Sequence, residues 1–229
     1  MDGVGDLSRR MTLGLLAGAL AAANASAQTV SAPALFGAPS GRRLAFTIWR
    51  NGQKIGLHTV SFQGDPASFH VQSDAAMLVK LGPIPIFRYH HQSIERWQDG
   101  RLSTFHSQSV SNGKTEQVTA VGSTSGMTID TATGRAVKAP LDALPLTHWN
   151  KKALSGPLFN PQTGALLHEA MSRQADQSVQ LANGQAVNAT RYSLSGEAQI
   201  TDWYDDEGVW TALRAKAMDG SSVDYRRSV

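Results

Sequence analysis

The sequence predicts an all-β protein: a single curved antiparallel sheet, forming a half-barrel or open barrel, of roughly ten to twelve strands. Apolar residues recur at every second position over most of residues 44–130, a period typical of strands. Turn pairs such as Asn51-Gly52 and Asn112-Gly113 divide this pattern, and Asn-Gly suits the positive φ angles of a type I′ hairpin turn. We find no helices of about a dozen residues between strands, which a parallel sheet would need.

The start of the chain predicts a cleavable export signal, residues 1–27. A polar start ends in Arg9-Arg10, an apolar run covers Met11–Ala23, and Ala25-Ser26-Ala27 has the small residues of a cleavage site. The apolar run is shorter than the roughly 20 residues of a membrane-spanning helix, so we expect no membrane span after cleavage. The segment Ser8–Leu13 is similar to the twin-arginine export motif, and the general secretory route is the alternative. We therefore expect a periplasmic or secreted protein.

Composition restricts what the remaining chain can bind. Residues 28–41 are rich in Ala, Pro, Ser and Gly and predict a flexible lead-in, which leaves residues 42–229 as a single β domain. The chain has no cysteine, so it has neither disulfides nor thiolate metal ligands. The net charge is +3, and the basic pairs are far apart without interleaved aromatic residues. This pattern argues against nucleic acid as a partner.

The segments of period two give the strands in order. They cover residues 44–49, 55–62, 69–80, 87–97, 102–110, 115–121, 127–130, 186–194, 200–204, 209–218 and 221–226, with shorter candidates at 166–171 and 178–181. Residues 140–150 break this period, because their apolar residues have helical as well as irregular spacing. We expect a short helical insertion at Leu141–Asn150.

One hairpin carries unusual side chains. Residues 200–210 predict a strand that ends on Trp203-Tyr204, an acidic turn closed by Gly208, and a returning strand that starts near Trp210. Residues 94–102 follow the same order, so this arrangement is first a way of ending hairpins. If Gly208 has a positive φ, a β-branched residue there should destabilise the turn.

Several short motifs carry a resemblance to a known family. They are Asn51–His58, Tyr89–His91 followed by Glu95–Leu102, Thr147–Asn150 and Trp203–Gly208. Together they resemble an uncharacterised family of exported bacterial proteins, known only as a domain of unknown function, over nearly all of residues 42–229. The glycine-ended hairpins are also similar to periplasmic half-barrel carriers of lipoproteins, which curl one sheet around an apolar hollow. The resemblance implies a fold and a compartment, and no catalytic residues.

Polar residues on one predicted strand suggest chemistry. His91 and Glu95 share a face, since side chains alternate along a strand. If Asp99-Gly100 closes a two-residue hairpin, His106 would lie diagonally between them and could complete a metal or catalytic group. Polar residues on a half-solvated face are the alternative interpretation. We expect neither a metal nor a cofactor.

Tryptophans near hairpin ends could either cover those ends or line the mouth of an apolar hollow. The candidate ligand-binding residues are Tyr89, His91, Glu95, Trp97, Trp203 and Trp210. The first hypothesis is a non-catalytic protein that binds an apolar or amphipathic envelope molecule, such as a lipid. The alternatives are an envelope hydrolase that uses His91 and Glu95, and a protein–protein interaction module.

Overall fold

The computed structural model describes residues 37–197, 199–217 and 219–228. The predicted signal, residues 1–27, and the lead-in up to residue 36 lie outside these described residues. The end of the lead-in is described: residues 37, 40 and 41 lie in turns, and Ala38 packs against the core.

Sixteen strands and one 3-10 helix are described, with no α-helix among them. The strands are β1 Arg43–Arg50, β2 Gln53–Gly64, β3 Ser68–Leu81, β4 Ile84–Gln98, β5 Arg101–Ser111, β6 Lys114–Ser123, β7 Gly126–Thr131, β8 Val137–Ala139, β9 Leu144–Pro145, β10 Leu158–Phe159, β11 Leu166–Leu167, β12 Ala170–Gln180, β13 Ala186–Ser195, β14 Ile200–Tyr204, β15 Trp210–Lys216 and β16 Ser222–Arg227. The 3-10 helix η1 covers Lys151–Ser155. The all-β prediction is confirmed, with more strands than expected.

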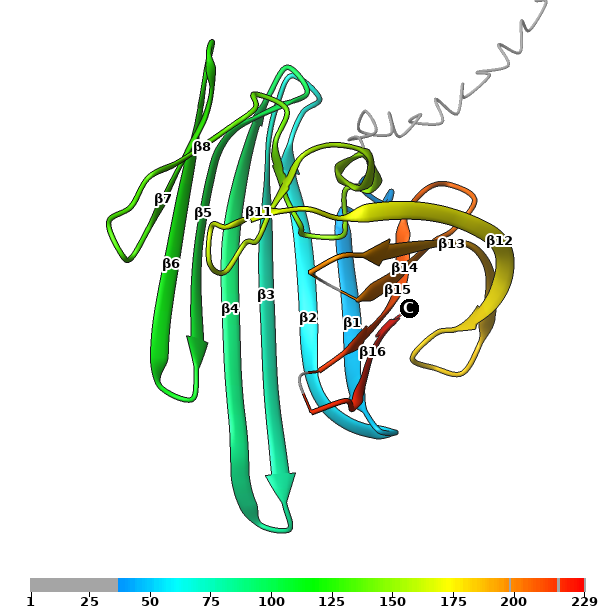
Figure 1. Cartoon of the computed structure of the whole chain (residues 1–229). Helices are drawn as coiled ribbons and strands as arrows, with labels where there is room; N and C mark the ends of the chain where they lie inside the picture. Colours follow the sequence, from blue (N-terminus) through cyan, green and yellow to red (C-terminus); the bar gives the residue numbers. More distant parts are fainter. Residues whose placement is uncertain (1–36, 198, 218, 229) are drawn as a thin grey trace, which may run out of the picture. The chain divides into compact units, whose positions relative to one another are not determined.

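Thirteen strands form one antiparallel sheet in the order β12-β13-β14-β15-β16-β1-β2-β3-β4-β5-β6-β7-β8 (Figure 1). The first strand pairs with the last, with Ile48 opposite Tyr225. The edges of the sheet are therefore β8 and β12, and within the described residues these two strands do not pair. The sheet is open, as an open barrel requires.

Residues 140–169 connect the two edge strands, from the end of β8 to the start of β12. We call them the crossing segment. They contain a small sheet in the order β11-β10-β9, in which β10 is parallel to β9 and antiparallel to β11. In Figure 1 the crossing segment runs across the strands of the large sheet.

The helical insertion expected at Leu141–Asn150 is wrong. That range holds β9 and tight turns, and the short helix η1 begins only after Asn150, whose side chain accepts a hydrogen bond from Lys152 N at 3.1 Å. Pro145 has no N–H for a helical hydrogen bond, which interrupts any helix in this range. Leu144 N instead donates to Pro157 O at 3.0 Å, so the apolar residues here belong to the small sheet.

The main core lies between the crossing segment and one face of the large sheet. We call this the inner face; it carries Phe46 and Phe105, both fully buried. The Phe105 and Phe159 rings meet edge to face, with centroids 5.4 Å apart. Trp149 likewise meets Trp97 edge to face at 5.6 Å. A tightly packed apolar layer therefore holds the crossing segment in place.

The opposite, outer face carries a second, smaller cluster. It contains Ala189, Trp203 and Ala212, with Val179 of β12 packed against them. At the end of the β12–β13 hairpin, Ala182 N donates to Arg227 O of β16 at 2.9 Å. This hairpin therefore bends back toward β16.

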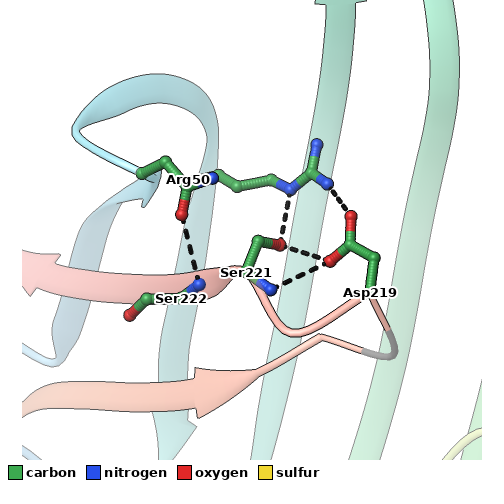
Figure 2. Close-up of polar contacts among 5 residues, drawn as sticks. Arg50, Asp219, Ser221 and Ser222 are labelled. Atoms are coloured by element: carbon green, nitrogen blue, oxygen red, sulfur yellow. Dashed lines mark hydrogen bonds and ion pairs between the residues drawn. The ribbon is translucent and has the colours of Figure 1, made fainter.

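The turn between β15 and β16 is fixed to the end of β1 (Figure 2). Arg50 Nε donates to Ser221 Oγ at 2.8 Å, and its guanidinium also pairs with Asp219. Asp219 in turn accepts from Ser221 N at 3.1 Å. The side chain of Asn51 accepts from Ser222 N at 3.3 Å. These contacts tie β1, the first strand along the chain, to the β15–β16 hairpin, which is the last.

The part of the chain that the structure describes has no helix long and apolar enough to cross a membrane.

Candidate functional site

A pocket of about 420 Å³ lies on the inner face, between the crossing segment and the sheet. Strands β2, β3 and β4 line one side, and β14, β15 and β16 line the other. Most lining side chains are apolar, and they include Ala75, Met77, Phe87, Ile200, Leu213, Ala215 and Val223. Three histidines, His58, His91 and His148, add polar groups to this lining.

His58 on β2 has one ring nitrogen without a partner. Its Nε2 lies 2.7 Å from Ser73 Oγ on β3, while its buried Nδ1 has no hydrogen-bond partner among the described residues. Burial, followed by the charges of His148 and His91, lowers the pKa of His58 to about 3. The ring is therefore neutral at pH 7. An unpaired buried ring nitrogen is costly, so a ligand group or water that pairs with it would be favoured.

His91 on β4 has a similar arrangement. Its Nδ1 lies 2.7 Å from Ser109 Oγ of β5, and burial lowers its pKa to about 4. The Tyr89 ring stacks beside it at 6.4 Å, and burial raises the pKa of Tyr89 above its usual range. Both side chains therefore present uncharged surfaces to the pocket at pH 7.

His148 belongs to the crossing segment, and side chains of the large sheet hold it in place. Its Nδ1 lies 2.9 Å from Oδ2 of the fully buried Asp202, whose Oδ1 accepts from Trp210 Nε1 at 3.0 Å. The Tyr204 hydroxyl donates to His148 O at 2.6 Å. His148 has φ 67°, a strained value for a residue with a side chain. These three contacts fix its ring beside Trp210, with centroids 5.4 Å apart.

Glu95 lies deeper on the same face of β4 and is fully buried. Its two carboxyl oxygens accept from Trp97 Nε1 at 2.9 Å and Trp149 Nε1 at 2.8 Å. Burial raises the pKa of Glu95 to about 7, against the opposing effect of hydrogen bonds from Trp149, Thr147 and Trp97. Glu95 thus links β4 to the crossing segment.

The structure brings together only part of the predicted ligand-binding set. Tyr89, His91 and Trp210 line the pocket. Glu95 and Trp97 lie nearby in the core and bond to each other. Trp203 belongs to the small cluster on the outer face, away from the pocket.

Sequence reasoning missed three residues of the site: His58, His148 and Asp202. The period-two pattern places His58 on the same face as Val60 and Phe62, which is a signal for the inner face. Asp202 and Trp203 are neighbours on their strand, so their side chains point to opposite faces of the sheet. No sequence signal pairs Asp202 with His148, because the crossing segment brings them together from 54 positions apart.

The expected position of His106 is wrong. The two-residue turn forms, since Gln98 pairs with Arg101, but a bulge follows between Arg96 and Trp97. One extra residue on β5 shifts the register, which moves the side chains of β5 to the other face. His106 therefore lies opposite Ile94 and is exposed on the outer face.

The acidic turn after β14 has a structural role. Asp205 Oδ1 accepts from Val209 N at 2.9 Å, and its Oδ2 pairs with Arg227 at 2.9 Å. Within the described residues, no group of three or more His, Asp or Glu side chains is placed to hold a metal ion.

A second hollow, of about 390 Å³, lies on the outer face over β2–β5. Its lining is mostly polar, and Asp74 there already accepts from Gln92 Nε2 at 2.7 Å and lies 3.2 Å from His90 Nε2. Because these groups satisfy one another at the surface, the inner pocket is the stronger candidate for a ligand.

Comparisons with known proteins give a family and a fold. One family, described as "Domain of unknown function (DUF6134)", matches residues 46–228. The chain is also similar to the crystal structure of a beta-barrel-like protein of domain of unknown function DUF1849 from Brucella abortus. The TM-score is 0.60 at 8% identity, over 81% of this chain and 94% of that chain. At this identity the similarity concerns the fold alone. The sequence matches no curated protein.

Proposed function

We propose a ligand-binding function for this chain, which belongs to the DUF6134 family, an uncharacterised family like the one that its sequence motifs resemble. The protein holds an apolar or amphipathic molecule in the inner pocket, with the apolar part against the side chains of β3, β4 and β15. The observation that carries this proposal is an apolar pocket of about 420 Å³ whose lining includes His58, a residue whose buried Nδ1 has no hydrogen-bond partner among the described residues.

The pocket suits a small amphipathic ligand in size and chemistry. Small-molecule sites commonly occupy about 300–1,000 Å³ and combine apolar walls with a few polar groups that orient the ligand. Here Met77, Phe87 and Leu213 supply apolar wall. His58 Nδ1 offers a polar atom that has no partner among the described residues, and pairing it with a ligand head group would remove the cost of its burial.

The hydrolase alternative is less well supported. Four residues along a strand separate His91 from Glu95 by about 13 Å, too far for both to act on one bond. Both oxygens of Glu95 already accept hydrogen bonds from indoles. The Ser73–His58 and Ser109–His91 pairs have the short distances of a nucleophile and its base. However, imidazoles with pKa values of about 3 and 4 are weak general bases at pH 7.

Titration with a fluorescent fatty-acid probe tests the proposal, and blocking the pocket locates the site. Ala215 lines the pocket, so Ala215→Trp should fill part of it and weaken probe binding by about tenfold or more. Ala76 is exposed and absent from the pocket lining, so Ala76→Trp is the matched control and should bind as wild type does. Equal affinities for both variants, or no binding by wild type, would refute the proposal.

A further inference from the structure

The β3–β4 hairpin extends beyond its neighbours. Strand β2 pairs with β3 only as far as Met77, and β5 pairs with β4 only from Tyr89 onward. The ladder pairs of residues 78–88 therefore join only the two strands of the hairpin itself, and beyond them the backbone of Arg88 bonds to Asn112 at the β5–β6 turn. In Figure 1 this hairpin projects past the ends of the adjacent strands.

The projecting end is apolar and exposed. Leu81 is 70% exposed, Ile84 62% and Ile86 52%. Two prolines, Pro83 and Pro85, add further apolar surface beside them. Folding buries most large aliphatic side chains, so a group of three at one extremity indicates a surface that contacts something apolar.

The charged residues within this end of the hairpin are all basic. Residues 80–88, which we call the hairpin tip, contain the exposed Lys80 and Arg88 and no acidic residue. An apolar end flanked by basic side chains fits a membrane surface, where the apolar groups enter the interface and the basic groups meet anionic head groups. A second copy of the chain fits less well, because it would bring the same positive charges together.

We propose that the hairpin tip docks onto lipid bilayers that contain anionic lipids. Leu81, Ile84 and Ile86 enter the interface between head groups and acyl chains, while Lys80 and Arg88 stay at head-group level. This proposal stands on the exposure and charge of the tip and does not need the pocket to bind a ligand.

The tip adjoins the pocket, so the two proposals together suggest that docking brings the pocket close to the bilayer. Met77 pairs with Tyr89 beside the tip, and Val79 pairs with Phe87, which belongs to the tip itself. Met77, Phe87 and Tyr89 also line the pocket. A docked tip would place this side of the pocket near the bilayer, where an amphipathic molecule could pass between the two.

A label at the tip tests docking directly. The chain has no cysteine, so Ile84→Cys provides a single attachment point for an environment-sensitive fluorophore such as NBD. Vesicles of phosphatidylcholine with phosphatidylglycerol should shift the emission of this label to the blue and increase its intensity. The control is Val121→Cys on β6, where the native side chain is 46% exposed. Val121 pairs with Thr104, which pairs with Arg96, so it lies level with the end of β4 opposite to the tip. Its label should not respond.

The outcomes separate the possible partners. An equal response at positions 84 and 121, or no response at 84, overturns the proposal. A shift at 84 that appears without vesicles and grows with protein concentration also overturns it, because self-association would then cover the tip. An equal shift with vesicles of pure phosphatidylcholine overturns the proposed preference for anionic lipids, which rests on Lys80 and Arg88.

A second variant measures the apolar contribution. Replacing an aliphatic side chain that enters the interface should lower the vesicle partition coefficient by about tenfold per residue. We therefore expect a large loss for the double variant Leu81→Asp, Ile84→Asp and none for Val121→Asp. Because both substitutions lie at a projecting tip, thermal unfolding should stay near wild type. Unchanged partition in a folded double variant would refute docking through these side chains.

Discussion

Glu95 shows how burial controls charge at a single residue. Its pKa is raised to about 7 by burial, above the ordinary value of 4.5. The folded protein therefore holds this proton more tightly than the unfolded chain does. The stability that comes from the neutral form is fully present below pH 4.5 and is lost as pH rises to about 7. The difference between these two pKa values corresponds to about 3 kcal/mol.

The first prediction follows from this linkage. Glu95→Gln removes the titration and turns an amide NH₂ toward one of the two indole N–H donors, so the variant should be less stable than wild type at pH 5. The difference in free energy of unfolding between the two proteins should shrink by about 3 kcal/mol between pH 4.5 and pH 8. Urea unfolding at several pH values measures this difference. A gap that is constant across this range would contradict the raised pKa.

His58 carries the second prediction, which concerns ligand selectivity. His58→Phe keeps a ring of similar size at this position of the pocket lining but removes the buried Nδ1 that has no partner among the described residues. We expect the variant to bind a fatty acid and its methyl ester with similar affinity, while wild type prefers the molecule with the stronger hydrogen-bonding head. His106→Phe, on the outer face, is the control and should behave as wild type. Unaltered selectivity in His58→Phe would remove His58 from head-group recognition.

At the scale of elements, the turns were the most predictable part of the chain. Asn51, Asp99 and Asn112 all have positive φ, and each is followed by a glycine with positive φ, as type I′ turns require. Strands joined by such turns are local in sequence, so alternation and turn residues locate them. The bulge beside Trp97 has no comparable signal, because it depends on how β4 and β5 pack, and it moved His106 to the other face.

The third prediction concerns the turn after β14. Gly208 has φ 76°, and a Cβ there would meet no atom within 4 Å, so the cost of a side chain comes from the backbone alone. Gly208→Val should destabilise the protein by about 1 kcal/mol or more. Gly41 has equally open space without a positive φ, so Gly41→Val provides the control. Thermal unfolding that is the same for both variants would show that the conformation of Gly208 carries no such cost.

At the scale of the whole molecule, the sequence predicts the sheet better than the site. Alternation along β1–β7 depends on neighbouring residues, whereas the pocket depends on which residues the crossing segment brings across the inner face. The prolines of this segment prevent the helix that its apolar spacing suggested, and His148 reaches Asp202 only through the resulting loop. Contacts of this kind arise from packing between distant segments, which a single sequence does not encode in any local pattern.

Asp202 connects three parts of the molecule, so its removal should loosen the crossing segment. Asp202→Ala removes the partner of His148 Nδ1 and leaves Trp210 Nε1 with Ala212 O as its remaining acceptor, so the free energy of unfolding should fall by about 2 kcal/mol. Asp206→Ala, at an exposed position in the following turn, is the matched control and should change stability little.

Hydrogen exchange shows where that loss occurs. If Asp202 holds the crossing segment on the sheet, amides such as Leu144 and Leu146, which bond to Pro157 O and Phe159 O, should exchange faster in Asp202→Ala. Amides of β5 and β6 should keep their protection, since their ladder does not involve Asp202. Uniformly faster exchange throughout the sheet would mean that Asp202 supports the whole fold, and that the crossing segment does not open as a separate unit over the pocket.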